Sequence, residues 1–102
     1  MKHQKLSCNE LKKSLTQLNS ENTVRWYLED EKLTKTFKFD DFNLAFEFMT
    51  RCATYAEQVN HHPEWYNVYG TVKVQLTTHD ASGITFKDFA MATKMDSFGC
   101  IG

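Results

Sequence analysis

The 102-residue sequence predicts an α+β fold in which three helices pack on one face of a four-stranded antiparallel sheet. Apolar residues recur at helical spacing in three segments, and two pairs of segments alternate apolar with polar residues. Residues typical of helix starts precede each helical segment. The expected order is helix, two strands, helix, two strands, helix, and we expect residues 1–102 to form a single domain.

The first third of the sequence predicts a helix followed by a hairpin. Ser7-Cys8-Asn9-Glu10 has the form of a capping box, in which the two end side chains satisfy free backbone amides at a helix start. Leucines at helical spacing extend this start into a helix over residues 8–18. Alternation over residues 23–39 then predicts two strands, with Trp26 in the core.

Asp40-Asp41 predicts the start of a long helix over residues 42–60, because aspartate is a favourable N-cap residue. One apolar stripe along this helix is expected to face the sheet. It consists of Phe42, Ala45, Phe46, Met49, Ala53 and Ala56.

The last third repeats the hairpin and helix pattern. Residues 65–69 and 71–78 predict two strands that turn at Gly70, which we expect to use its tolerance of positive φ. Thr85 and Asp88 again have the spacing of a capping box. The apolar side of the helix that follows is expected to contain Phe86, Phe89, Ala90 and Thr93.

Composition indicates the class of protein. A net charge of −1 does not provide the basic surface that nucleic-acid binding requires, so no direct contact with DNA or RNA is expected. The 3 cysteines are far apart, which favours a reducing compartment. No signal peptide is evident, and no apolar run approaches the roughly 18 residues of a membrane span. We therefore expect a soluble cytoplasmic protein without membrane contact, and a nuclear location is also open.

Histidines indicate where the chemistry lies. Three of the 4 histidines, His61, His62 and His79, occur within a short stretch that also contains the only proline, Pro63. Imidazole exchanges protons near neutral pH and also binds metals. Glu57 precedes His61 by one helical turn and is expected to face it. The alternative is a surface histidine pair at a helix end with an unrelated histidine at the end of a strand.

The spacing from Glu57 through His61-His62-Pro63, Tyr69 and His79 to Asp88 resembles the signature of the pterin-4a-carbinolamine dehydratases. The flanking segments 60–69 and 76–79 are also similar to this family. The resemblance covers about residues 20–95 and implies the α+β fold predicted above. It further implies dehydration of a 4a-hydroxytetrahydropterin to a quinonoid dihydropterin, in support of tetrahydrobiopterin recycling. The family uses no metal or organic cofactor, and its members form dimers or tetramers.

The resemblance also implies roles for individual residues. His61 and His79 would transfer protons, and His62 would orient the substrate. Asp88 would orient a histidine or cap the third helix, and Glu57 would support His61. The implied substrate contacts are Pro63, Thr78, Asp80 and Ala81. We expect both proton-transfer histidines at the surface, where replacement by alanine spares the fold.

Two other functions remain open at this point. The three histidines equal the number of protein ligands in a catalytic zinc site. Animal relatives in the family also act as dimerisation cofactors of a homeodomain transcription factor, so a transcription-factor partner is a second alternative. The exposed edge of the predicted sheet could pair with another copy, and we therefore expect a homo-oligomer.

Overall fold

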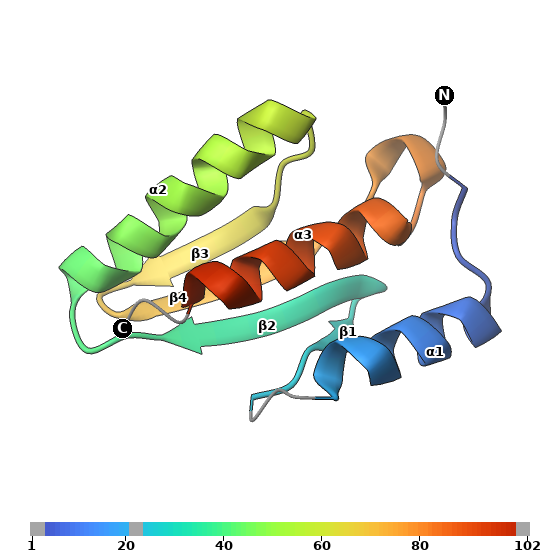
Figure 1. Cartoon of the computed structure of the whole chain (residues 1–102), viewed down its shortest axis with the longest axis horizontal. Helices are drawn as coiled ribbons and strands as arrows, with labels where there is room; N and C mark the ends of the chain where they lie inside the picture. The colour runs from blue at the N-terminus through green and yellow to red at the C-terminus, as the bar shows by residue number, and fades with distance from the viewer. Residues whose placement is uncertain (1–3, 21–23, 100–102) are drawn as a thin grey trace.

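The computed structural model describes residues 4–20 and 24–99. Its elements confirm the predicted fold class and order. They are α1 (Cys8–Asn19), β1 (Tyr27–Glu29), β2 (Lys32–Lys38), α2 (Phe42–Val59), β3 (Glu64–Val68), β4 (Thr71–Leu76), the 3₁₀ segment η1 (His79–Ala81) and α3 (Phe86–Phe98). The helices cover one face of the sheet, and α3 lies between α1 and α2 (Figure 1).

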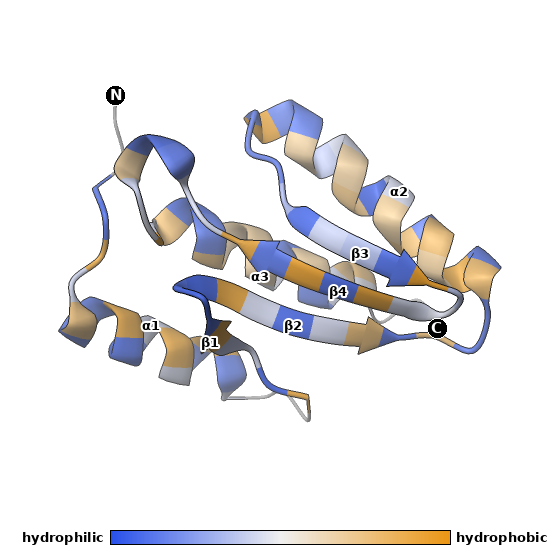
Figure 2. Ribbon diagram, turned by 180° about the vertical axis from the view of Figure 1, so that it is seen from behind, coloured by the Kyte–Doolittle hydropathy of each residue, from blue (hydrophilic) through white to orange (hydrophobic). Residues whose placement is uncertain are grey.

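The sheet is antiparallel throughout, with strands in the order β1-β2-β4-β3. β2 and β4 form its centre, where Lys35 pairs with Val74 and Phe37 pairs with Val72. Hydrophobic and hydrophilic residues alternate along β4 (Figure 2), which separates a helix-facing side from an open side. Val72, Val74 and Leu76 are buried on the helix-facing side.

The core joins the sheet to α3 through a partly buried polar cluster. Trp26 is 1% exposed, which confirms its predicted place in the core. Its indole Nε1–H donates to Asp96 of α3, and the Lys35 ammonium lies 2.7 Å from the same carboxylate. Buried charges are tolerated when they are paired in this way.

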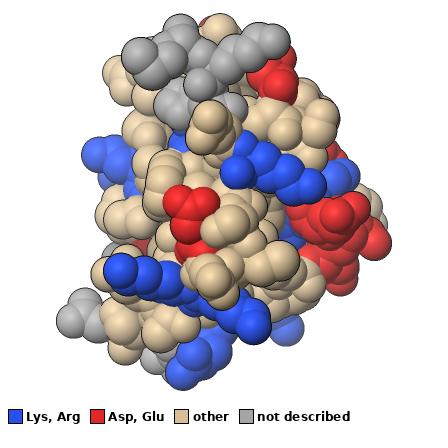
Figure 3. Space-filling model, turned by 90° about the vertical axis from the view of Figure 1, so that its right-hand side faces the viewer, with Lys and Arg blue, Asp and Glu red and all other residues tan. Residues whose placement is uncertain are grey.

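On the open side of the sheet, Glu29 accepts hydrogen bonds from Lys73 and Gln75. The hydrogen bond to Glu29 raises the pKa of Lys73. Basic and acidic side chains are both scattered over the face shown in Figure 3, without a continuous basic surface there.

The buried stripe of α2 differs from the predicted one. The buried residues are Ala45, Phe48, Cys52 and Ala56, whereas Phe42 and Phe46 are 45% and 54% exposed. Ala53 is exposed as well. Ala45 and Ala56 are thus buried as predicted, and Met49 is partly buried against the core. The core-facing stripe contains Phe48 and Cys52 in place of the predicted Phe42, Phe46 and Ala53.

The apolar side of α3 was also predicted incorrectly. Phe89 is buried, but Phe86 is 57% exposed and Ala90 is exposed. The other buried residues of α3 are Asp88, Met91, Ala92 and Met95. Because α3 packs against a helix on each side as well as the sheet, its buried surface is wider than a single stripe.

The turn between β3 and β4 does not use Gly70 as predicted. Tyr69 has the positive φ, 52°, and no glycine among the described residues has one. A Cβ on Gly70 would clash with the carbonyl oxygen of Phe39. The Phe39 amide donates to the Gly70 carbonyl at 2.8 Å, so the backbones at Phe39 and Gly70 are in direct contact. This close approach leaves no room for a side chain, and the position therefore requires glycine.

Within residues 4–20 and 24–99, no helix combines the length and apolar character needed to span a bilayer.

Candidate active site

Four segments meet around a cavity of about 310 Å³: the end of α2, the start of β3, the region of η1 and the start of α3. The predicted site residues on its lining are His61, His62, His79, Pro63, Thr78 and Asp80. Asn60, Glu64 and Lys87 complete the lining. The fold thus brings the three histidines of the motif to one cavity, while Glu57, Ala81 and Asp88 lie outside the lining.

The end of α2 directs His61 and His62 to different partners. Asn60 caps the helix in the left-handed conformation, at φ 53° and ψ 47°. Asparagine tolerates this region better than most residues. The chain turns off the helix axis there, and Pro63 restricts His62 to extended backbone. The two imidazoles consequently form their hydrogen bonds on separate elements.

Glu57 does not pair with His61 as predicted. Its carboxylate lies 2.8 Å from Nε2 of His62. The helical one-turn rule fails here because the left-handed Asn60 removes His61 from the face that carries Glu57. The Glu57–His62 pair has side chains that are 79% and 53% exposed, so water screens it.

His61 is paired inside the protein. Its side chain is 8% exposed, and Nε2 lies 2.6 Å from Oδ1 of Asp88, which is fully buried. The expectation that both proton-transfer histidines lie at the surface is therefore wrong for His61. Asp88 both binds this histidine and closes the capping box of α3, so the two alternatives proposed for it occur together.

Two threonines complete the surroundings of Asp88. The Thr78 hydroxyl donates to Oδ2 at 2.8 Å, and the Thr85 amide donates to the same atom at 2.9 Å. The hydroxyls of Thr78 and Thr85 lie 2.8 Å apart. Sequence reasoning assigned Thr78 to substrate contact and Thr85 to the helix start alone. The capping-box spacing predicted that Thr85 lies beside Asp88. Nothing in the sequence indicated that Thr78 forms hydrogen bonds with both residues.

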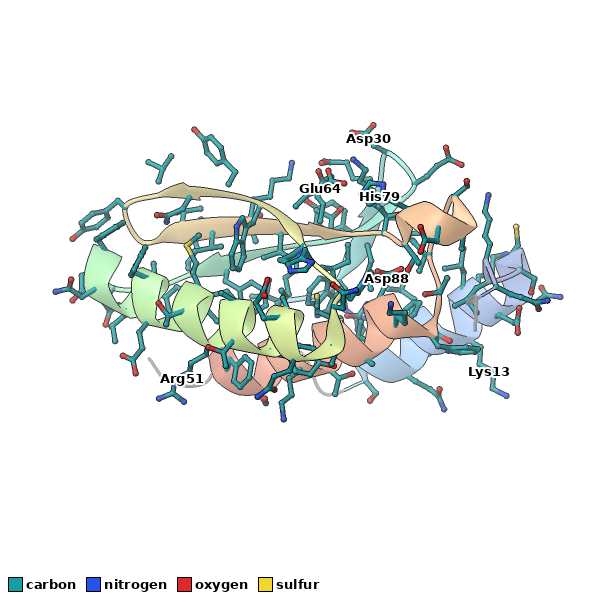
Figure 4. The ribbon with its side chains drawn as sticks, turned by 90° about the horizontal axis from the view of Figure 1, so that it is seen from above. Lys13, Asp30, Arg51, Glu64, His79 and Asp88 are labelled. Atoms are coloured by element: carbon teal, nitrogen blue, oxygen red, sulfur yellow. The ribbon has the colours of Figure 1, made fainter. Side chains whose placement is uncertain are left out.

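His79 opens η1 and is far more exposed than His61, at 80% of its side chain. Its Nε2 lies 3.9 Å from Oε2 of Glu64, whose other oxygen binds Lys32 at 2.7 Å. Figure 4 shows His79 beside Glu64, with Asp88 on the side of the helices. Glu64 was missed as a site residue because it lies just before the predicted strand of residues 65–69, and nothing in the sequence connected it to His79.

The part of the chain that the structure describes contains no group of three or more His, Cys, Asp or Glu side chains arranged to hold a metal ion. His61 and His62 turn to Asp88 and Glu57. The arrangement provides imidazoles of different exposure on one cavity, and such groups donate and accept protons near neutral pH. Fold and cavity together define an α+β protein with a histidine-lined site suited to proton transfer.

Comparison with known proteins identifies the family. The family model for "Pterin 4 alpha carbinolamine dehydratase" matches residues 4–98, and the chain belongs to this family. A protein of Solibacter usitatus named "Putative pterin-4-alpha-carbinolamine dehydratase" is 47% identical over 93 residues, which cover 91% of this chain and 93% of that protein. A protein of Sinorhizobium fredii with the same name is 55% identical over 73 residues, which cover 70% of each chain.

Solved structures confirm the fold. The crystal structure of a "transcriptional coactivator/pterin dehydratase" from Brucella melitensis matches with a TM-score of 0.85 and 41% identity, covering 93% of this chain and 98% of that one. A pterin dehydratase-like protein described as a RuBisCO assembly factor in the alpha-carboxysome matches with a TM-score of 0.62 and 19% identity, covering 78% of this chain and 92% of that one. The second likeness concerns the fold alone.

Proposed function

We propose that this protein dehydrates 4a-hydroxytetrahydropterin to quinonoid dihydropterin by histidine acid/base catalysis, with His61 and His79 as the proton-transfer residues. The observation that carries the proposal is the meeting of His61, His62 and His79 on one cavity, in a chain of the pterin dehydratase family. The reaction needs no oxidant or reductant, because it only removes water.

Two protons move in this reaction. An acid donates a proton to the 4a-hydroxyl, so that the C4a–O bond breaks and water leaves. A base removes the N5 proton, and the electron pair of the N–H bond completes a C4a–N5 double bond. Imidazoles suit both tasks at neutral pH. The distances within the site do not distinguish which of His61 and His79 is the acid, and His62 is proposed to orient the substrate.

The proposed substrate contacts differ in their positions. Pro63, Thr78 and Asp80 line the cavity. Pro63 and Asp80 are available for direct contact, whereas the Thr78 hydroxyl donates to Asp88, so the proposed contact of Thr78 would use its other atoms. Ala81 lies outside the lining, and its amide donates to the Thr78 carbonyl at 3.1 Å. Ala81 is therefore proposed to act through the backbone, by holding Thr78 in place.

A dehydration assay tests the proposal. We would measure the rate of 4a-hydroxytetrahydropterin dehydration with and without the protein, in the presence of a chelator. We expect an acceleration that survives chelation and is lost in the His61→Ala/His79→Ala double variant. Lys12→Ala/Lys13→Ala, which changes two exposed residues of α1, is the matched control. No acceleration by the wild type would overturn the proposal, and loss of activity on chelation would favour the metal alternative.

The wider role follows from the reaction. We propose that the protein returns pterin released by aromatic amino acid hydroxylases to the tetrahydrobiopterin pool, in the cytoplasm, as a homo-oligomer. The edge strand β3 and the exposed rings of Phe42 and Phe46 on α2 support an association between copies. These rings lie 5.6 Å apart and form one apolar surface.

A protein-binding role is the second candidate. The Brucella melitensis relative is described as a coactivator as well as a dehydratase. We propose, as the alternative, that this chain is a dimerisation cofactor of a transcription factor with little enzymatic role. If the His61→Ala/His79→Ala double variant retained the full cellular function of the wild type, the binding role would be the main one.

A further inference from the structure

The buried hydroxyls of Thr78 and Thr85 form a directed chain of hydrogen bonds. Each hydroxyl has one proton. The proton of Thr78 is donated to Asp88, so the 2.8 Å bond between the two threonines must be donated by Thr85. The Thr85 oxygen in turn accepts from the Lys87 amide at 3.2 Å. Thr78, Thr85 and Asp88 are 6%, 0% and 0% exposed, so water does not compete for these bonds.

The chain of bonds ends at His61. Asp88 accepts from Thr78 and from the Thr85 amide at Oδ2, which leaves Oδ1 for the imidazole at 2.6 Å. An ionised carboxylate can only accept, so the proton of this last bond resides on Nε2 of His61. In the neutral ring, Nδ1 then carries the lone pair.

Nδ1 of His61 has access to the cavity. It forms no hydrogen bond with any residue of the described chain, yet no buried side-chain nitrogen or oxygen among these residues lacks a partner. Nδ1 is therefore not enclosed, and the opening available to this buried side chain is the cavity that it lines. Nε2 therefore faces Asp88, and Nδ1 is the ring nitrogen that is available for proton transfer.

We infer that His61 exchanges protons with the substrate through Nδ1, and that Thr78 and Thr85 are positioning residues that fix this choice through Asp88. The kinetic part of the inference rests on the proposed function, whereas the tautomer does not. During turnover, Nδ1 gains or loses the proton, and the Nε2–H bond to Asp88 stays in place. Without the Thr78 hydroxyl, only the Thr85 amide still holds Oδ2, so the carboxylate can rotate more freely and holds Nε2–H of His61 less firmly.

Thr78→Val is the informative substitution. Valine preserves the branched shape of threonine and replaces the hydroxyl by a methyl group. The backbone of Thr78 keeps its hydrogen bonds to Gly83 and Ala81, so we expect η1 to stay in place in this variant. Thr78→Ser restores the hydroxyl and serves as the rescue variant. Thr34→Val is the matched control, because Thr34 is also 0% exposed and hydrogen-bonded but lies on the open side of the sheet.

The first measurement is the ¹⁵N NMR spectrum of the imidazoles, which distinguishes a protonated ring nitrogen from one with a lone pair. In the wild type we expect the neutral ring of His61 to be protonated at Nε2. Thr78→Val should introduce the other tautomer, while Thr78→Ser and Thr34→Val should retain the wild-type spectrum. A wild-type ring protonated at Nδ1, or an unchanged His61 spectrum in Thr78→Val, would overturn the inference.

The second measurement is steady-state kinetics of dehydration. We expect Thr78→Val to lower kcat by about tenfold with little change in KM, because it removes one hydrogen bond to a charged group. Thr78→Ser should recover most of this loss, and Thr34→Val should lose stability without losing kcat. An unaltered kcat in Thr78→Val contradicts the positioning role. Absence of activity in the wild type would instead overturn the proposed function, while the NMR result would still decide the tautomer.

Discussion

At the scale of single residues, the two proposed proton-transfer histidines differ in how far the fold depends on them. His61 is 8% exposed and lies 2.6 Å from a fully buried carboxylate, whereas His79 is 80% exposed. We expect His61→Ala to lower the free energy of unfolding by about 1–3 kcal/mol, because the buried Asp88 carboxylate loses one of its hydrogen-bond partners. His79→Ala should change it by no more than about 0.5 kcal/mol.

Urea unfolding of both variants at neutral pH would check this difference. Lys12→Ala on α1 again provides an exposed control. Equal losses in the two histidine variants would contradict the expectation, and would mean that Asp88 finds another partner when His61 is removed.

The cysteines allow a separate prediction. Cys8 is exposed and Cys52 is buried, and both are free thiols. Burial raises the pKa of Cys52 to about 12, so this thiol remains protonated and unreactive near neutral pH. We expect iodoacetamide at pH 8 to modify Cys8 and to leave Cys52 intact until the protein unfolds, as read by peptide mass spectrometry. Rapid native-state labelling of Cys52 would show that α2 opens readily.

Cys52 also makes stability depend on pH at the alkaline end. Its pKa is higher in the folded protein, at about 12, than the ordinary value of 9.0 that applies on unfolding. The unfolded state therefore loses this proton first as the pH rises. The contribution of Cys52 to stability is complete below about pH 9 and is lost between about pH 9 and 12. Cys52→Ala should reduce this alkaline loss of stability in urea titrations, although it leaves a small cavity at every pH.

At the scale of elements, the turn from β3 to β4 contains two adjacent residues, Tyr69 and Gly70, with different constraints. One constraint is on the backbone conformation and the other is on the space for a side chain. Tyr69 occupies the left-handed region that glycine prefers, while Gly70 is excluded from carrying a side chain by the Phe39 carbonyl. We expect Gly70→Ala to destabilise the protein by about 1–3 kcal/mol through this contact. Tyr69→Gly should be neutral or slightly stabilising, because glycine adopts the left-handed backbone conformation without the steric cost that tyrosine has there. Thermal unfolding of the pair, with Gly99→Ala for comparison, would test this assignment.

The sequence was sufficient for the helices, the strands and their order, because each depends on local signals, whereas η1 was not predicted. The capping boxes at Ser7 and Thr85 and the N-cap at Asp41 all occur as predicted. The faces of the helices were not predictable in the same way. In α2, Phe46 and Phe48 are equally apolar, and only the position of the sheet decides that Phe48 is buried.

Six of the predicted site residues line the cavity, but the contacts of the site were not predicted. The spacing of the motif identified the three histidines that the fold brings to one cavity. Their partners depend on the backbone at Asn60, whose left-handed conformation assigns Glu57 to His62 rather than to His61. Because Asn60 leaves the helical region, the one-turn spacing rule no longer applies to the residues after it. The spacing in the sequence does not show that Asn60 has this conformation.

At the scale of the whole molecule, the proposed homo-oligomer has two candidate surfaces. Val68 is 52% exposed on the edge strand β3, and Phe46 is 54% exposed on α2. We expect the wild type to sediment as an oligomer, because both surfaces would bury apolar area on association. Val68→Lys and Phe46→Lys test them separately by light scattering. A monomeric wild type would contradict the proposal, and dissociation by only one variant would identify the surface in use.

The two capping boxes of this protein offer unequal freedom to a protein engineer. The Ser7–Glu10 box of α1 is exposed, and its hydrogen bonds connect only the residues of the helix start. The Thr85–Asp88 box of α3 is buried and shares its carboxylate with His61. Helix-start redesign is a common route to thermostability, but here it is safe only at α1. At α3, replacing Asp88 to improve the helix start could raise the stability of the protein, but the His61 imidazole would lose the carboxylate that orients it.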